Sequence, residues 1–137
     1  MYQRFTVILL IAIPAWADDK KLDSAAIEGV WEVVSTTYDG KEVAAKGRTL
    51  VFGEKKFTTF IGDKKKRAVA FTLDPSTDPK RIDMDRGDKD GKALGIYEID
   101  MDQLKLCYGE PGAERPKAFE SKPGKKVFLI ILRRAKG

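Results

Sequence analysis

The chain of 137 residues carries 26 lysines and arginines against 21 aspartates and glutamates, and it contains no histidine. The lack of histidine excludes Ser-His-Asp and Cys-His catalysis, histidine-ligated haem and histidine-containing zinc sites in their usual forms. Cys107 is the only cysteine, so one chain can form neither an internal disulfide nor an all-cysteine metal site. We therefore expect no catalytic residues, no metal and no cofactor.

The first 17 residues are predicted to be an export signal. Arg4 supplies a positive charge before the apolar run 5–13, and Ala15 and Ala17 are small residues at the positions that a signal peptidase reads. The apolar run is far shorter than the roughly 20 residues of a membrane-spanning helix. We expect cleavage near Ala17 and a single periplasmic or extracellular domain over residues 18–137, with no membrane span and a net charge of +4 after the loss of Arg4.

The elements expected after this signal are short. Residues 22–27 suit one or two helical turns, with Ser24 as the N-cap and with Leu22 and Ile27 closing one end of the fold. Alternating apolar residues and turn-forming breaks then predict eight strands, at 31–38, 49–52, 56–61, 68–73, about 82–84, 94–99, 104–108 and 127–132. Between them we expect turns, including a basic turn over residues 64–67 and a long loop over residues 109–126.

Eight short strands without helical crossovers predict an all-β fold, an eight-stranded antiparallel up-and-down barrel of the lipocalin-like kind. An open sandwich is the alternative. Gly29 and Trp31 open the first strand, and Arg133 and Arg134 end the last. Closure makes these strands neighbours, so one arginine can cover the indole, a contact worth about 0.5–2 kcal/mol. Consecutive strand residues face opposite sides, so the other arginine is expected to face solvent.

Several stretches of the chain also resemble a known family. They are Glu28–Val34, Tyr38–Val43, Phe71–Pro75, Leu94–Ile99, Leu104–Tyr108 and Pro111–Pro116. On these residues the chain is similar to the small exported lipocalin-like, calycin-type domains of planctomycete bacteria, a family of unknown function. The resemblance implies a calycin-like barrel outside the cytoplasm, and it implies no activity.

The leading functional hypothesis is a non-enzymatic barrel that binds a small apolar or amphipathic molecule. Large side chains at alternating positions are the candidate interior residues: Trp31, Val33, Phe52, Phe57, Phe71, Tyr97, Leu106 and Tyr108. The same side chains are numerous enough to fill a small barrel completely. The alternative function is therefore an interaction module of the cell envelope, with a packed barrel and no ligand. The sequence does not indicate the oligomeric state.

Other polar features favour structural roles. Cys107 alternates with Leu106 and Tyr108, so we expect it to face outward beneath a loop, with a reactive thiol as the alternative. The acidic run Asp83, Asp85, Asp88, Asp90 and Gly91 lacks the spacing of a calcium loop. Glu98 is expected outside the barrel. The basic clusters at 55–56, 64–67 and 125–126 suit solvated hairpin ends; an anionic envelope polymer is the alternative partner, and nucleic acid is not expected.

Two roles are possible for the long loop over residues 109–126. Loops of this length are uncommon in compact domains unless they are functional. It can gate the barrel mouth, or it can be a crossover stiffened by its three prolines.

Overall fold

The computed structural model describes residues 22–87, 89 and 91–136, and the export signal predicted for residues 1–17 lies outside them. The described chain is almost entirely β-structure. Its strands are β1 (Gly29–Tyr38), β2 (Lys41–Val43), β3 (Arg48–Phe52), β4 (Lys56–Ile61), β5 (Lys64–Asp74), β6 (Lys80–Asp85), β7 (Lys92–Asp100), β8 (Gln103–Gly109) and β9 (Val127–Arg134).

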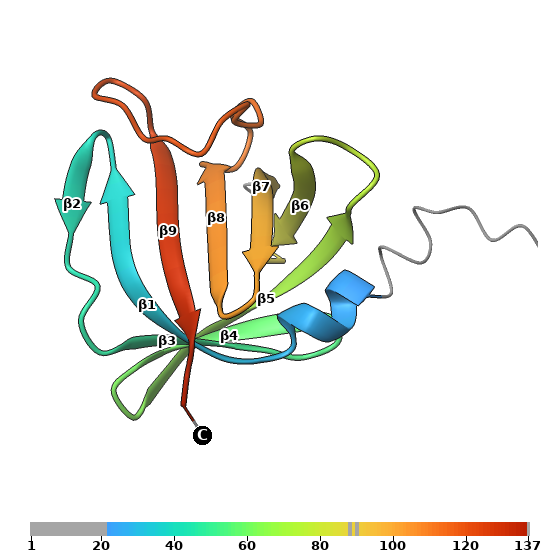
Figure 1. The fold of residues 1–137 in the computed structure, drawn as a ribbon. Helices are drawn as coiled ribbons and strands as arrows, with labels where there is room; N and C mark the ends of the chain where they lie inside the picture. The colour runs from blue at the N-terminus through green and yellow to red at the C-terminus, as the bar shows by residue number, and fades with distance from the viewer. Residues whose placement is uncertain (1–21, 88, 90, 137) are drawn as a thin grey trace, which may run out of the picture.

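The strands close into a barrel. β1 pairs with β3, each strand from β3 to β8 pairs with the next one along the chain, and β9 returns to pair with β1, all antiparallel (Figure 1). This closure makes a barrel of eight strands, because β2 pairs only with the last three residues of β1. The predicted eight-stranded antiparallel barrel is confirmed, and β2 is an addition that the sequence reading did not contain.

The β1–β2 hairpin has a local cause. Asp39 and Gly40 form its turn and both have positive φ, 51° and 72°. Positive φ at both central residues is the requirement of a type I′ turn, which matches the twist of paired strands. β2 is therefore a consequence of the Asp-Gly pair, a turn signal that follows the predicted first strand at 31–38.

One end of the barrel is closed by a short helix over residues 22–27. The Trp31 indole donates to the carbonyl of Ile27 at 2.8 Å, and Ile27 is fully buried. The Tyr97 hydroxyl donates to Asp23 Oδ2 at 2.6 Å, so the helix is tied to β7 as well. Two expectations were wrong here: Ser24 lies inside the helix rather than at its N-cap, and Leu22 is 67% exposed.

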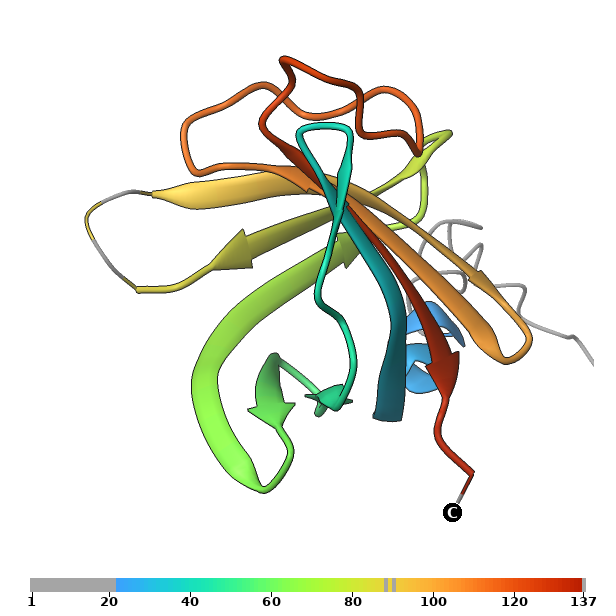
Figure 2. The ribbon, with the colours of Figure 1, turned by 90° about the vertical axis from the view of Figure 1, so that its left-hand side faces the viewer.

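At the opposite end the strands extend further than expected. Residues 64–67 were predicted as a basic turn, but they form the start of β5, and the turn is Gly62 and Asp63. In Figure 2 the β6–β7 connection lies at the left, and the helix and the β7–β8 turn lie at the right, at opposite ends of the barrel. We call the end away from the helix the mouth.

The long connection between β8 and β9, residues 110–126, packs on the outside of the barrel wall. Arg115 donates to the carbonyls of Ile82 (3.2 Å) and Gly95 (2.8 Å). It also lies 2.7 Å from Asp83 Oδ1. These contacts hold the connection against β6 and β7. Such an arrangement is typical of a crossover that lies against the wall of the barrel. Among the described residues, no helix is long and apolar enough to span a membrane.

Candidate functional site

The closed end of the barrel is occupied by structural contacts. The Arg134 guanidinium lies 4.1 Å from the centre of the Trp31 ring and donates to the carbonyls of Ala26 and Glu28. Gly29 has a φ of 121°, and a Cβ there would lie 3.2 Å from Arg134 Nη1. Arg133 faces the other way, where it bonds the exposed Glu32 at 3.2 Å. Arg134 is thus the arginine that covers the indole.

The middle of the barrel is filled by side chains. Trp31, Phe52, Tyr97 and Leu106 face inward and are each at most 2% exposed. Phe71 is 7% exposed and packs edge-on against Phe52, with ring centroids 5.3 Å apart. All of these are candidate interior residues, and all belong to the packed core. The filled-barrel expectation therefore describes this part of the interior.

At the mouth the interior opens into a pocket of about 470 Å³. Its walls come from five consecutive strands, β4 to β8, and combine apolar and basic side chains. They are Phe57, Thr59, Lys66, Arg67, Val69, Met84, Arg86, Ala93 and Tyr108. Of the eight candidate interior residues, Phe57 and Tyr108 line this mouth pocket. Its volume falls in the range of pockets that hold small molecules, about 300–1,000 Å³.

Tyr108 marks the polar side of the mouth pocket. Burial raises the pKa of Tyr108 to about 12, while the charges of Arg86 and Arg48 act in the opposite direction. The hydroxyl is therefore neutral at physiological pH and able to donate a hydrogen bond. Arg86, directly after β6, thus lines the pocket together with this phenol, and the charge of Arg48 from β3 also acts on it.

Two further aromatic rings continue from Tyr108 around the wall. Phe128 stacks on Tyr108 with centroids 5.2 Å apart, and on Tyr38 with centroids 4.3 Å apart. The Tyr38 hydroxyl donates to Glu110 at 2.6 Å, and this bond raises the pKa of Tyr38. The three rings lie on the adjacent strands β8, β9 and β1, so they form a continuous aromatic row at the mouth.

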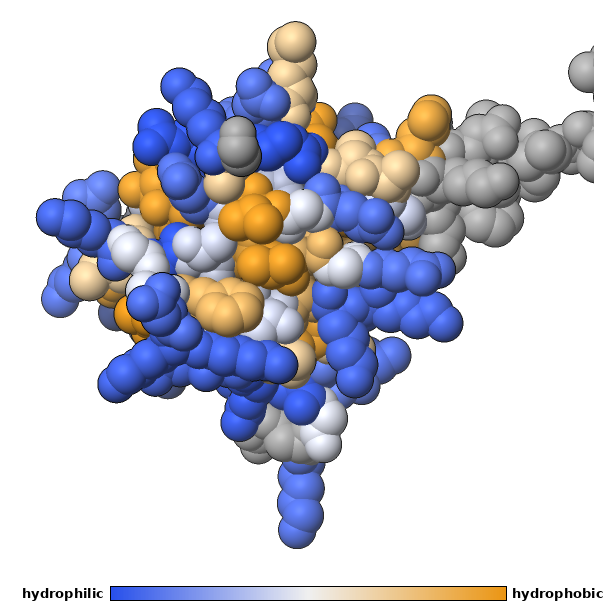
Figure 3. Space-filling model, turned by 90° about the horizontal axis from the view of Figure 1, so that it is seen from below, coloured by the Kyte–Doolittle hydropathy of each residue, from blue (hydrophilic) through white to orange (hydrophobic). Residues whose placement is uncertain are grey.

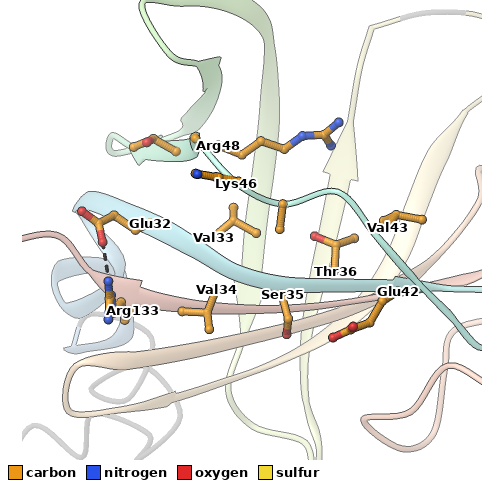
Figure 4. A pocket seen from close by; sticks show the side chains of 13 residues that line it. Glu32, Val33, Val34, Ser35, Thr36, Glu42, Val43, Lys46, Arg48 and Arg133 are labelled. Atoms are coloured by element: carbon orange, nitrogen blue, oxygen red, sulfur yellow. Dashed lines mark hydrogen bonds and ion pairs between the residues drawn. The ribbon is translucent and has the colours of Figure 1, made fainter.

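A second hollow, of about 620 Å³, opens through the side wall (Figure 4). β3 pairs with β1 only up to Glu32, and β2 pairs only from Thr36, so the three residues between them have no partner on that side. The register between β1 and β9 also shifts between Val33 and Ser35. We call this opening the side window. Val33, another of the candidate interior residues, lines it.

Arg48 belongs to both regions. It lines the side window, and its charge acts on Tyr108 at the mouth. In Figure 4 its side chain extends on the same side of β1 as Val33 and Thr36. Alternation with the buried Leu50 and Phe52 also places Arg48 on the inner face of β3. The exposed Arg48 side chain therefore starts from the inner face of β3, at the open end of that strand.

Apart from Lys66 and Arg67, which line the mouth pocket, the remaining predicted features lie elsewhere. Cys107 faces outward and is buried beneath the long connection, where its thiol contacts the carbonyls of Ala118 (3.5 Å) and Glu120 (3.6 Å). Glu98 is exposed on the outside. The basic residues at 55–56, 64–67 and 125–126 are also exposed.

The acidic run at 83–91 is engaged in protein contacts where it is described. Asp83 pairs with Arg115, and Asp85 Oδ1 accepts from the amide of Gly87 at 2.8 Å. Asp88 and Asp90 lie outside the described residues. Within the described ranges, no group of three or more cysteines and carboxylates is arranged to hold a metal ion.

Sequence reasoning missed Arg48 and Arg86 as residues of the mouth, whereas Arg67 belonged to a basic cluster that it had noted. Alternation carried the signal, since Arg86 follows Met84 by two residues and Arg48 precedes Leu50 by two. Both were overlooked because each lies just beyond the bounds assigned to its strand. No family model, curated protein or solved structure matches the chain.

Proposed function

We propose that the protein is an exported, non-enzymatic barrel that binds a small apolar or amphipathic molecule at its mouth. The observation that supports this most directly is the mouth pocket itself, a hollow of about 470 Å³ next to the packed middle of the barrel. Its apolar walls, including Phe57, Val69 and Met84, would gain by exchanging water for hydrocarbon. The exported location and the absence of catalysis rest on the sequence.

Native mass spectrometry tests this proposal. The full chain is produced in an exporting bacterial host, and the mature protein is measured before and after organic extraction. We expect a bound mass of a few hundred daltons that extraction removes. A bare protein mass that persists after incubation with host envelope lipids would contradict ligand binding.

A second function is favoured by the surface. Val34 and Val43 are 54% and 41% exposed, and both line the side window. Figure 3 shows the face that lies at the bottom in Figure 1. Apolar side chains gather near its middle, and hydrophilic ones surround them. Exposed apolar groups of this kind are typical of protein-binding surfaces. The alternative proposal is therefore an envelope interaction module that uses its outer face.

The alternative has its own test, a substitution at the side window. Val34→Ser would weaken the capture of an envelope protein and leave any small-molecule binding at the mouth unchanged. Loss of small-molecule binding together with unchanged protein capture in this variant would contradict the alternative.

A further inference from the structure

The charge at the mouth is unbalanced. Arg48 and Arg86 form no ion pair with a described residue, whereas Lys80, Arg115, Lys122 and Arg133 each lie within 4.0 Å of a described carboxylate. Two cations near an apolar pocket that have no ion-pair partner in the described part of the chain repel each other and favour an anion between them. A guanidinium presents paired donors that match the two oxygens of a carboxylate or phosphate.

The Tyr108 hydroxyl adds a neutral donor between these charges. No hydrogen bond joins it to another described residue, although its ring is packed against the core. The hydroxyl of a partly buried tyrosine with no partner among the described residues gains a hydrogen bond when an acceptor arrives. Arg86 and Tyr108 thus offer two donor groups on the wall of the pocket, and Arg48 from β3, whose charge acts on Tyr108, offers a third beside it.

The floor of the mouth pocket limits how far the apolar tail of a ligand can extend into the barrel. Phe57 lines the pocket and packs against Phe52 and Phe71, with centroids 4.9 and 6.1 Å away. These rings belong to the filled core, so an apolar tail can descend only as far as Phe57. The pocket therefore suits a short tail rather than a long one that fills the barrel.

We propose that the mouth pocket binds an amphipathic anion, with its oxyanion headgroup between Arg48 and Arg86 and beside the Tyr108 hydroxyl. The short apolar tail lies against Phe57 and Met84. This inference rests on the proposed function, and it adds the chemical class of the ligand. The shared chemistry is the oxyanion, which a carboxylate and a phosphate monoester both carry.

Calorimetric titration with three probes of equal tail length tests the inference: decanoate, decyl phosphate and 1-decanol. We expect at least one anion to bind at least tenfold more tightly than 1-decanol. Arg48→Gln and Arg86→Gln should each weaken that anion about tenfold, because each removes a charged hydrogen-bonding group. Both should leave the affinity for 1-decanol within about twofold. The two anions distinguish a carboxylate ligand from a phosphate ligand.

Two further variants separate the effect of the site from general effects of lost charge or lost stability. Lys55→Gln removes the same charge from the exposed β3–β4 turn at the other end, and it should leave anion binding unchanged. Tyr108→Phe removes only the hydroxyl and should weaken the anion several-fold, which keeps the test informative if an arginine variant fails to fold. Equal binding of anions and 1-decanol, unaffected by these variants, would overturn the inference but leave the proposed function intact. Failure of all three probes to bind would contradict both.

Discussion

The guanidinium of Arg134 lies over the indole of Trp31 at 4.1 Å, where the last strand closes the barrel on the first. Both side chains also donate hydrogen bonds to carbonyls at the end of the helix. Trp31 donates to the Ile27 carbonyl, and Arg134 donates to the carbonyls of Ala26 and Glu28. The last carbonyls of a helix have no partners within it. This pair therefore closes the barrel and caps its helix at the same time.

Arg134→Gln is expected to lower the free energy of unfolding by about 2–4 kcal/mol, because it removes the contact with the ring and the charged hydrogen bonds to the helix. Arg133→Gln is the matched control. Arg133 is 70% exposed and pairs only with Glu32, so its loss should cost under about 1 kcal/mol. Denaturant unfolding of both variants measures the difference, and equal losses would refute the assigned roles.

The choice between these arginines shows where sequence reasoning reached its limit. Alternation correctly requires that only one faces Trp31. Deciding which one needs the register, and in the structure Trp31 pairs directly with Arg134. The shift between Val33 and Ser35 changes the face that later β1 residues present, and no local sequence signal marks it. Pairing between strands about a hundred residues apart is a tertiary property.

The candidate site was also predictable only in part, because alternation gives the face of each residue but not the position of a hollow. Inward and outward faces follow from alternation, and all eight candidate interior residues lie on inner positions. Which of them line a hollow depends on how side chains fill the barrel. Trp31 and Tyr97 meet the helix and become core, whereas Phe57 and Tyr108 lie at the end that the helix leaves open.

Arg115→Ala is expected to expose Cys107. Arg115 ties the long connection to β6 and β7, and burial beneath that connection raises the pKa of the Cys107 thiol. A buried, protonated thiol reacts slowly. Reaction with a thiol-specific chromogenic reagent at pH 7.5 should be slow in the original protein and at least tenfold faster in the variant. Lys117→Ala, at an exposed position in the same connection, should leave the rate unchanged. Equal rates in the original protein and Arg115→Ala would show that Arg115 does not secure the connection.

Tyr108 is expected to make stability depend on pH in the alkaline range. Its pKa is about 12 in the folded chain, against an ordinary 10.0. Between these values the unfolded chain releases the phenolic proton and the folded chain keeps it. The free energy of unfolding therefore falls as pH rises from 10 to 12, by about 1–3 kcal/mol from this group. Tyr108→Phe should show a smaller fall in denaturant unfolding over that range. An identical pH dependence in the two proteins would rule out the raised pKa.

The central claim is that a small amphipathic molecule occupies the mouth pocket, and two methionines report on it. Met84 lines the pocket, while Met101 is 86% exposed in the β7–β8 turn at the other end. In protein labelled with ¹³C at the methionine methyl groups, decanoate should shift the Met84 resonance in a saturable way and leave Met101 in place. A saturable shift at Met101 alone, or no shift at either methyl group, would contradict the claim.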